Sequence, residues 1–550
     1  MKTSSFWKAL PFAIAFALPG VALADEDACY LHREMPLERQ LRRLSIDLRG
    51  TVPDVSEYEA IAGETELPDE VIDAYLDSDE LRFQLRRYHE DLLWTNPLTA
   101  LGDVGFSLTT QSLPGAGTVY FVSSQGKRKL YRGGDGTHNC QDKPQSELGY
   151  DPVTGFPIAE EVGVDGSGPY FAEGWVEVHP YWDPDPNKKI KVCAFDAQVT
   201  ETYAYDTGSG TAQVSCDHNL AAGKKECGCG PDLRFCMLTS VVEPAVLSSM
   251  REQLLRLVDD HTKGDRPYSD IVLTKRNWVN GPLVHYFKYL GQRQTFSRTQ
   301  NLHTPSDGAL PDLPYTASDT WVEVTREEPH AGILTLPAYL LRFQTNRGRA
   351  NRYRIAFEGQ YFPPPEAKDQ NCAPEGDDLT TRCVCRGCHT ALEPMAAFFG
   401  QLVEAGTTSL RDYERGFATA KECQKGILPP STAWCDRFYV QAPDPVDPDI
   451  RPYKLKALRY GDDAHPQVEP NFEAGPAKLA QADIDGGVFH DVATRHLFEH
   501  LMKRPVNFDP TSPDYEGDLV ADLAKEFRAH DNLKLLIKAL VKLPQYRRMP

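Results

Sequence analysis

The distribution of cysteine constrains the fold of this chain more than any other feature of its sequence. Six of the thirteen cysteines lie between Cys140 and Cys236, in a stretch rich in Gly, Pro, Asp and aromatic residues. Sustained helical periodicity is missing there, and the apolar runs are short and alternating, as in strands. Disulfides stabilise such a region where a small core cannot. The sequence therefore predicts a cysteine-rich region of loops and short strands at residues 96–240.

Zinc is the alternative partner for the last four cysteines of this region. These are Cys216, Cys227, Cys229 and Cys236. Common zinc modules contain paired C-x-x-C halves, which the Cys-Gly-Cys spacing at 227–229 lacks. Disulfides are therefore the favoured interpretation.

A second group of cysteines contains the sequence Cys385-Arg386-Gly387-Cys388-His389, which is the C-x-x-C-H pattern of covalent haem attachment. The spacing has a mechanical reason. Two thiols add across the two vinyl groups of haem, and the next residue then lies beneath the iron, where an imidazole binds axially. The sequence predicts one haem c, bound covalently to Cys385 and Cys388, with His389 as the proximal iron ligand.

Two other uses of these residues remain open. In the first, Cys385 and Cys388 form ordinary disulfides beside a surface histidine. In the second, they bind zinc together with Cys383, which lies two residues upstream. Cys383 has its simplest role in a disulfide with Cys372.

The first residues have the pattern of a secretory signal peptide. Lys2 and Lys8 accompany an apolar stretch that ends in the small-x-small sequence Ala22-Leu23-Ala24. This stretch is shorter than the ~20 residues that a membrane span needs, and no later segment supplies such a run. We expect cleavage of residues 1–24, no transmembrane segment, and a periplasmic, cell-surface or secreted protein in an oxidising compartment.

Helical periodicity flanks the cysteine-rich region on both sides. Pro36 and Gly50 bracket leucines spaced along one helical face, and the apolar pattern returns at 243–261. The expected fold class is mainly α: a multi-domain helical protein with a disulfide-rich loop and short-strand insertion and a monohaem cytochrome c-like segment. The predicted order after the signal peptide is a helical domain at 25–95, the cysteine-rich region at 96–240, a helical domain at 241–360, the haem c-binding segment at 361–440, a Pro/Asp-rich linker at 441–488 and a helical domain at 489–550.

The sequence does not fix the sixth iron ligand. His330 and His500 are the distal candidates, and His496 lies one helical turn before His500. Met395 is only six residues beyond His389, which keeps it on the proximal side. A Met or His ligand favours electron transfer, whereas an open position permits peroxide or oxygen chemistry.

Charge and motif content narrow the function further. The formal net charge of −20 argues against a general role on nucleic acids or anionic membranes, because both need clustered Lys and Arg. It favours a redox partner protein with a basic docking surface. The chain has no H-E-x-x-H, Walker loop or G-x-S-x-G. Asp-rich loops such as Asp183-Pro184-Asp185 and the run from Asp444 to Asp449 lack EF-hand spacing, which favours solvated turns over calcium sites.

Several short motifs occur in an order that resembles a known family. They are His330-Ala331-Gly332-Ile333-Leu334-Thr335-Leu336-Pro337-Ala338, Pro363-Pro364-Pro365, the haem motif with Leu392-Glu393-Pro394, the segment from Leu41 to Gly50, and Leu501-Met502-Lys503-Arg504-Pro505. The order resembles the planctomycete-type cytochrome c family, large exported proteins built from several helical domains with a single C-x-x-C-H. The resemblance implies haem attachment at Cys385 and Cys388 and axial ligation by His389. Residues 96–240 have no counterpart in it, and Glu393 and Ala396 stand where the family usually has Asp and Gly.

The expected function is that of an exported monohaem c-type cytochrome, which transfers electrons within or to a larger redox assembly. A shuttle cytochrome needs only about a hundred residues, so the rest of this chain serves docking or another purpose. One alternative is a haem enzyme of peroxidase or oxidase type with an open sixth position. The other is a non-enzymatic surface binding or assembly protein. Electron transfer is favoured over enzyme activity.

Overall fold

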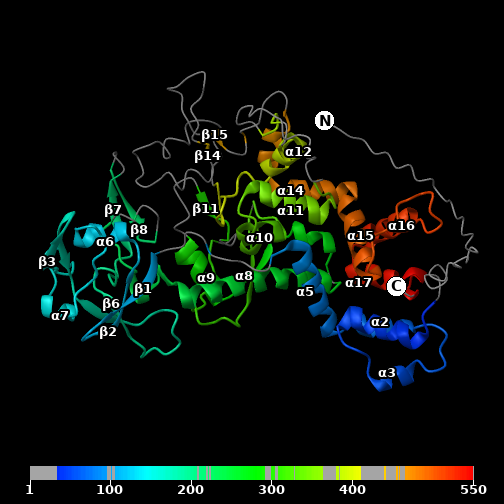
Figure 1. Ribbon diagram of the computed structural model, residues 1–550, viewed down its shortest axis with the longest axis horizontal. Coiled ribbons are helices and arrows are strands. Elements are labelled where there is room, and N and C mark those ends of the chain that lie inside the picture. The colour runs from blue at the N-terminus through cyan, green and yellow to red at the C-terminus, as the bar shows by residue number, and fades with distance from the viewer. Residues whose placement is uncertain are drawn as a thin grey trace, which may run out of the picture.

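The computed structural model describes residues 34–95, 101, 106–206, 210–217, 221, 224–264, 266–291, 299–303, 308–327, 329–362, 379–382, 385–410, 439–440, 454–455, 458 and 465–548. The predicted signal peptide at 1–24, Cys372, Cys383 and residues 441–453 of the predicted linker lie outside the described residues. Two parts are visible in the described chain: a disulfide-linked sheet at one end and a larger body of helices (Figure 1).

The N-terminal helices form where the sequence pattern predicts them. Helix α2 (Leu37–Arg49) begins after Pro36 and ends at Gly50, whose φ of 74° is the left-handed conformation that commonly closes a helix. The face that α2 buries carries three leucines: Leu41, Leu44 and Leu48. The following helices are α3 (Val55–Ala60), α4 (Asp69–Leu76) and α5 (Asp79–Leu93). The predicted start, period and end of the first helix are confirmed.

A five-stranded mixed sheet occupies the region predicted as loops and short strands, and the predicted mainly α class is wrong. Helices make up 47% of the structure and strands 16%. The strands in spatial order are β5 (Trp175–Val178), β6 (Ile190–Cys193), β2 (Gly117–Val122), β1 (Phe106–Leu113) and β9 (Cys236–Leu238). The parallel pairs, β1 with β9 and β2 with β6, join strands far apart in the chain. Alternation within each strand cannot reveal such distant partners, so the pattern predicted isolated strands rather than a sheet.

Three disulfides stabilise this region: Cys140–Cys193, Cys216–Cys227 and Cys229–Cys236. All six of its cysteines are therefore paired, which confirms the predicted disulfides and excludes the zinc alternative for them. Helices α6 (Gln125–Arg132) and α7 (Gln145–Leu148), the turn η2 (Pro231–Leu233), and two hairpins lie around the sheet. The hairpins are β3 (Glu160–Asp165) with β4 (Gly168–Ala172) and β7 (Thr202–Asp206) with β8 (Thr211–Ser215).

Helix α8 (Thr239–Thr262) continues directly from β9 into the helical body, and it contains the helix predicted near 243–261. The other helices of the body are η3 (Tyr268–Val272), α9 (Gly281–His285), η4 (Tyr286–Leu290), η6 (Gly332–Thr335), α10 (Pro337–Arg342), α11 (Asn346–Phe357), α12 (Arg386–Ala397), α14 (Val468–Gly486), α15 (Val488–Met502), α16 (Gly517–His530), α17 (Leu533–Val541) and α18 (Pro544–Arg547). Three short strand pairs complete the described elements: β10 (Arg276–Val279) with β12 (Val322–Thr325), β11 (Thr299–Asn301) with β13 (Thr408–Leu410), and β14 (Tyr439–Val440) with β15 (Lys454–Leu455).

One apolar core joins helices from the beginning, middle and end of the chain. Its buried residues run from Leu41 in α2 to Tyr546 in α18. Polar contacts reinforce this packing: Arg86 of α5 pairs with Asp259 of α8, and the Tyr268 N–H donates to the Asp531 carbonyl at 2.8 Å. The segments predicted as separate helical domains therefore share a single core. None of the described helices combines the length and apolar character needed to cross a bilayer.

The disulfides allow a test of how the sheet is stabilised. Cys140–Cys193 closes a separation of 53 residues, whereas Cys216–Cys227 closes only 11. Loop-closure entropy predicts losses of about 4 and about 3 kcal/mol when each bond is removed by a double Cys→Ala substitution. In urea unfolding, the Cys140→Ala/Cys193→Ala variant should therefore have a lower free energy of unfolding than the Cys216→Ala/Cys227→Ala variant. The reverse order would show that native-state packing outweighs loop entropy.

Candidate cofactor site on helix α12

The first turn of α12 brings the three residues of the haem motif onto one side of a helix. The N–H groups of Cys388 and His389 both donate to the Cys385 carbonyl, at 3.1 and 3.0 Å, so the turn is helical from Cys385 onward. Residues at positions i, i+3 and i+4 share a helical face. Both cysteines are free thiols and half-buried. The described part of the chain places no atom within 4 Å of a Cβ built at Gly387, so this turn borders open space.

A buried carboxylate fixes the orientation of the His389 ring. His389 Nδ1 lies 2.5 Å from Glu393 Oε1, one turn further along α12. A carboxylate only accepts hydrogen bonds, so Nδ1 carries the proton and Nε2 keeps its lone pair. Glu393 is only 7% exposed, and its Oε1 also accepts from Arg347 Nε at 2.6 Å. The imidazole is therefore in the tautomer that binds a metal through Nε2.

Neighbouring helices hold α12 in place. It packs against α11 and α14. Asn471 Nδ2 of α14 donates to the Pro394 carbonyl at 2.9 Å, and Gln401 Nε2 donates to the Phe472 carbonyl at 2.8 Å. The first N–H of α11, on Asn346, donates to Glu404 in the turn that follows α12. These contacts tie the C-terminal end of α12 to α14 and to the start of α11.

The donor set at α12 fits a covalently bound haem c. Two unpaired thiols at the required spacing supply the attachment points, and an imidazole whose Nδ1 is bonded to Glu393 presents Nε2 as an axial ligand. Neither cysteine forms a disulfide, which removes the first of the two other uses. The zinc alternative needs Cys383, which lies outside the described residues.

The distal candidates lie on other elements. His330 precedes η6, which packs against η3, α8 and α10, and its Nδ1 lies 2.6 Å from Thr335 Oγ1. His500 is in the last turn of α15, where its ring packs edge-on against Tyr88 of α5. In the described chain, neither histidine hydrogen-bonds or stacks with a residue of α12. Burial lowers the pKa of His500, and it lowers the pKa of His496 to about 4.

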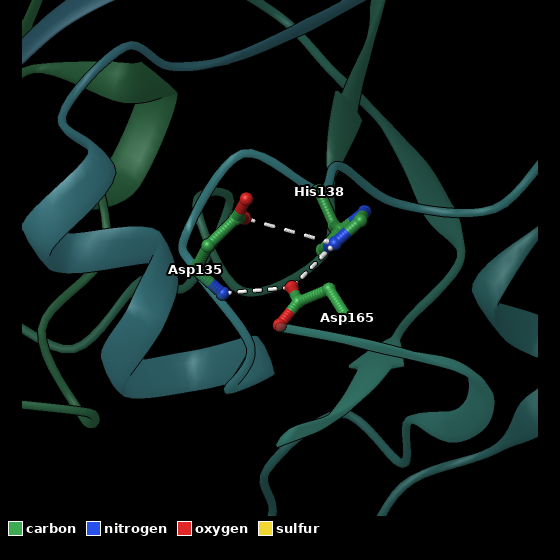
Figure 2. A group of neighbouring side chains, drawn as sticks. All are labelled: Asp135, His138 and Asp165. Atoms are coloured by element: carbon green, nitrogen blue, oxygen red, sulfur yellow. Dashed lines mark hydrogen bonds and ion pairs between the residues drawn. The ribbon is translucent and has the colours of Figure 1, made fainter. Parts of the chain in front are cut away.

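A second group with metal-ligating chemistry lies in the cysteine-rich region, where sequence reasoning missed it. Asp135, His138 and Asp165 each place one ligand atom within 4.8 Å of the others (Figure 2). Asp165 Oδ2 accepts from the Asp135 N–H at 2.8 Å and from His138 Nε2 at 2.9 Å. The only sequence signal is Asp-x-x-His at 135–138, which Asp165 joins through the hairpin of β3 and β4. The residues satisfy one another as a hydrogen-bonded turn, so nothing in the group requires an ion.

Comparison of the chain with family models, curated proteins and solved structures finds no match. The resemblance to the planctomycete-type cytochrome c family therefore stays a prediction. Function has to be argued from the residues of the site itself.

Two carboxyl groups near α12, those of Asp483 in α14 and Glu358 at the end of α11, have raised pKa values. Tyr353 of α11 donates to Asp483 Oδ2 of α14 at 2.6 Å, and burial raises the pKa of Asp483. Burial, together with the charge of Asp483, raises the pKa of Glu358 at the end of α11 to about 7. The contact between α11 and α14 therefore favours a protonated Glu358.

This protonation predicts a pH-dependent stability. Glu358 releases its proton near pH 4.5 in the unfolded chain and near pH 7 in the folded protein. The folded state binds more protons between these values, so stability falls as pH rises from about 4.5 to about 7. The midpoint of urea unfolding should decrease as pH rises across this range in the wild type. This pH dependence should become weaker in Glu358→Gln and stay the same in the exposed control Glu59→Gln. An unchanged slope in Glu358→Gln would assign the effect to other groups.

Proposed function

We propose that this protein is an exported monohaem c-type cytochrome that transfers electrons within or to a larger redox assembly. The observation that carries the proposal is the first turn of α12. There, two free, half-buried thiols and an imidazole with a free Nε2 lie at the C-x-x-C-H spacing. The three disulfides of the cysteine-rich region and the absence of a membrane-spanning helix among the described residues agree with a periplasmic or cell-surface location.

The residues of α12 have distinct roles in this proposal. Haem, when bound, supplies the one-electron chemistry of its iron. Cys385 and Cys388 hold it through thioether bonds, so it cannot dissociate in a dilute compartment. His389 binds the iron through Nε2. Glu393 fixes the ring plane and holds the Nδ1 proton, while Arg347 balances the charge of that carboxylate.

Docking is the proposed role of much of the remaining chain. The helical body and sheet far exceed the about one hundred residues that can enclose a haem. With a net charge of −20, the protein favours a redox partner that presents a basic surface. Association with such a partner weakens as salt rises, because exposed charges are screened over about 10 Å at 0.1 M ionic strength.

One observation favours a haem enzyme as the second candidate function. A carboxylate that accepts the Nδ1 proton makes the imidazole a stronger electron donor, which stabilises the oxidised iron. Such an axial ligand suits peroxide or oxygen chemistry when the sixth position is open. The His389–Glu393 pair is compatible with both functions, and the sixth ligand separates them.

Haem attachment provides the direct test. The full-length protein is produced in a host that matures c-type cytochromes, denatured, and stained for haem on a gel. We expect covalent haem in the wild type and in Cys383→Ala, and none in Cys385→Ala/Cys388→Ala, because only the motif thiols form thioethers. Denatured wild-type polypeptide without haem would refute the proposal. On the native protein, a low-spin spectrum that carbon monoxide does not change supports electron transfer. High-spin iron that binds carbon monoxide supports the enzyme.

The charge balance around His389 predicts opposite shifts of reduction potential. Glu393→Gln removes the carboxylate and should raise the potential by about 50–100 mV, which corresponds to ~1–2 kcal/mol for one electron. Arg347→Met leaves the carboxylate less neutralised and should lower the potential. Spectroelectrochemical titration measures both. Shifts of the same sign would mean that the variants loosen the haem pocket rather than change the electron donation of His389.

A further inference from the structure

The helical body and the sheet together bury three arginines almost completely: Arg132, Arg326 and Arg349. Arg132 pairs with two buried carboxylates, those of Glu173 and Asp196. Arg349 donates to four oxygens between 2.8 and 3.2 Å away: those of Leu340, Phe343, Val403 and the Asn346 side chain. Two of the three guanidinium groups thus have several oxygen acceptors, although Nη1 of Arg132 has no partner in the described chain. Arg326 has no oxygen acceptor for its side chain there.

Arg326 lies one residue beyond β12 and is 1% exposed. Its Nη1 donates to His303 Nδ1, and the His303 ring stacks on Phe287. Its Nε and Nη2 are buried and have no hydrogen-bond partner in the described chain. No carboxylate pairs with it there, and burial alone lowers its pKa to about 9. Two N–H donors of the Arg326 guanidinium, on Nε and Nη2, therefore have no acceptor in the described chain.

His330 brings a further unpartnered nitrogen to the same part of the core. Gly332, with φ 44°, makes the turn that places His330 there, and a Cβ at this glycine would lie 2.0 Å from the Ile271 carbonyl oxygen. His330 is fully buried, its Nδ1 is bonded to Thr335 Oγ1, and its Nε2 has no partner. The His330 N–H donates at 3.1 Å to the carbonyl of Glu327, the residue after Arg326, so a tight turn brings His330 back toward Arg326. Burial lowers the pKa of His330, and the charge of Arg326 lowers it further. When the Thr335 hydroxyl donates to Nδ1, the ring proton lies on Nε2, which is then another donor.

A buried charge without a counter-ion is costly, by several kcal/mol for each ion. Unfilled donors on a buried guanidinium add to this cost. The charge of Lys275, whose carbonyl accepts from the Arg326 N–H at 2.9 Å, also acts on His330. Lys275 and Arg326, at the ends of two paired strands, thus lie close to His330, in the turn before η6. In the described chain no carboxylate pairs with Arg326. Such an arrangement is typical of an anion site rather than of a structural core.

We propose that Arg326 and His330 bind the carboxylate or other oxyanion group of a ligand, with His303 orienting the guanidinium. Nε and Nη2 of Arg326 present two parallel N–H groups, a geometry that matches two oxygens of one anion. The anion has two conceivable sources with the same chemistry: a free carboxylate or phosphate, or a propionate group of the haem. Either source gives His330 a role other than iron ligation.

Anion-dependent stability of the full-length protein tests this site. Melting temperatures are measured in a chloride buffer and with increasing phosphate or acetate at constant ionic strength. Two forms are compared: the protein from a cytochrome-maturing host, and Cys385→Ala/Cys388→Ala, which cannot attach haem. In each form Arg326→Met and His330→Gln are compared with Arg276→Met, which removes a half-buried arginine that, unlike Arg326, pairs with a carboxylate, that of Glu323 on the same two strands. General salt effects act on all variants alike.

We expect added anion to raise the melting temperature of the wild type and of Arg276→Met by about 2–5 °C until the effect saturates. Arg326→Met should lose this rise. Without anion, Arg326→Met should melt higher than the wild type, because an apolar side chain replaces an uncompensated charge. A rise in both forms assigns the site to a free anion. A rise only in the haem-free form assigns it to a propionate. If phosphate and acetate stabilise Arg326→Met as much as the wild type in both forms, the proposal is wrong, whatever the haem stain shows.

Discussion

Burial of α8 against helices from both ends of the chain is the interaction on which the rest of the structure depends. Its apolar side, with Val246, Leu254 and Val258, lies in the core that also contains α2, α5, α15 and α17. β9 runs directly into α8, so the disulfide-linked sheet is attached to the same helix (Figure 1). Because this core closes the helical body, α11 and α14 have fixed positions, and α12 is held between them.

The charged side chains at the two candidate sites differ in their hydrogen-bond partners. At α12 one buried carboxylate, that of Glu393, is shared between an imidazole and a guanidinium, so each polar group is satisfied while Nε2 of His389 stays available. At Arg326 two buried donors have no acceptor in the part of the chain that the structure describes. Satisfied networks rigidify a protein, whereas unsatisfied buried donors are expensive. The first arrangement leaves Nε2 of His389 able to bind a metal, and the second leaves the Arg326 guanidinium without a carboxylate in the described chain.

Local sequence predicted the elements whose signals lie within one segment. Pro36, the leucine spacing and Gly50 predicted the start, buried face and end of α2. The apolar period at 243–261 predicted a helix that lies within α8. Clustered cysteines in a region without helical period predicted disulfides correctly. The mixed sheet was missed because β1 pairs with β9 and β2 with β6 across long stretches of chain. The Arg347–Glu393 contact and the Arg326–His303 contact were missed for the same reason, since their partners are distant in sequence.

By itself, the sequence predicted covalent haem attachment, because the C-x-x-C-H spacing is a local property that a helical turn places on one face. It also determined the helix boundaries set by proline and glycine. Only the tertiary structure decided which nitrogen of His389 is free, how the sheet is ordered, and that Nε and Nη2 of Arg326 are buried without an acceptor among the described residues. Hydrogen-bond satisfaction and burial depend on contacts between segments far apart in the chain, and these contacts exist only once the core has closed.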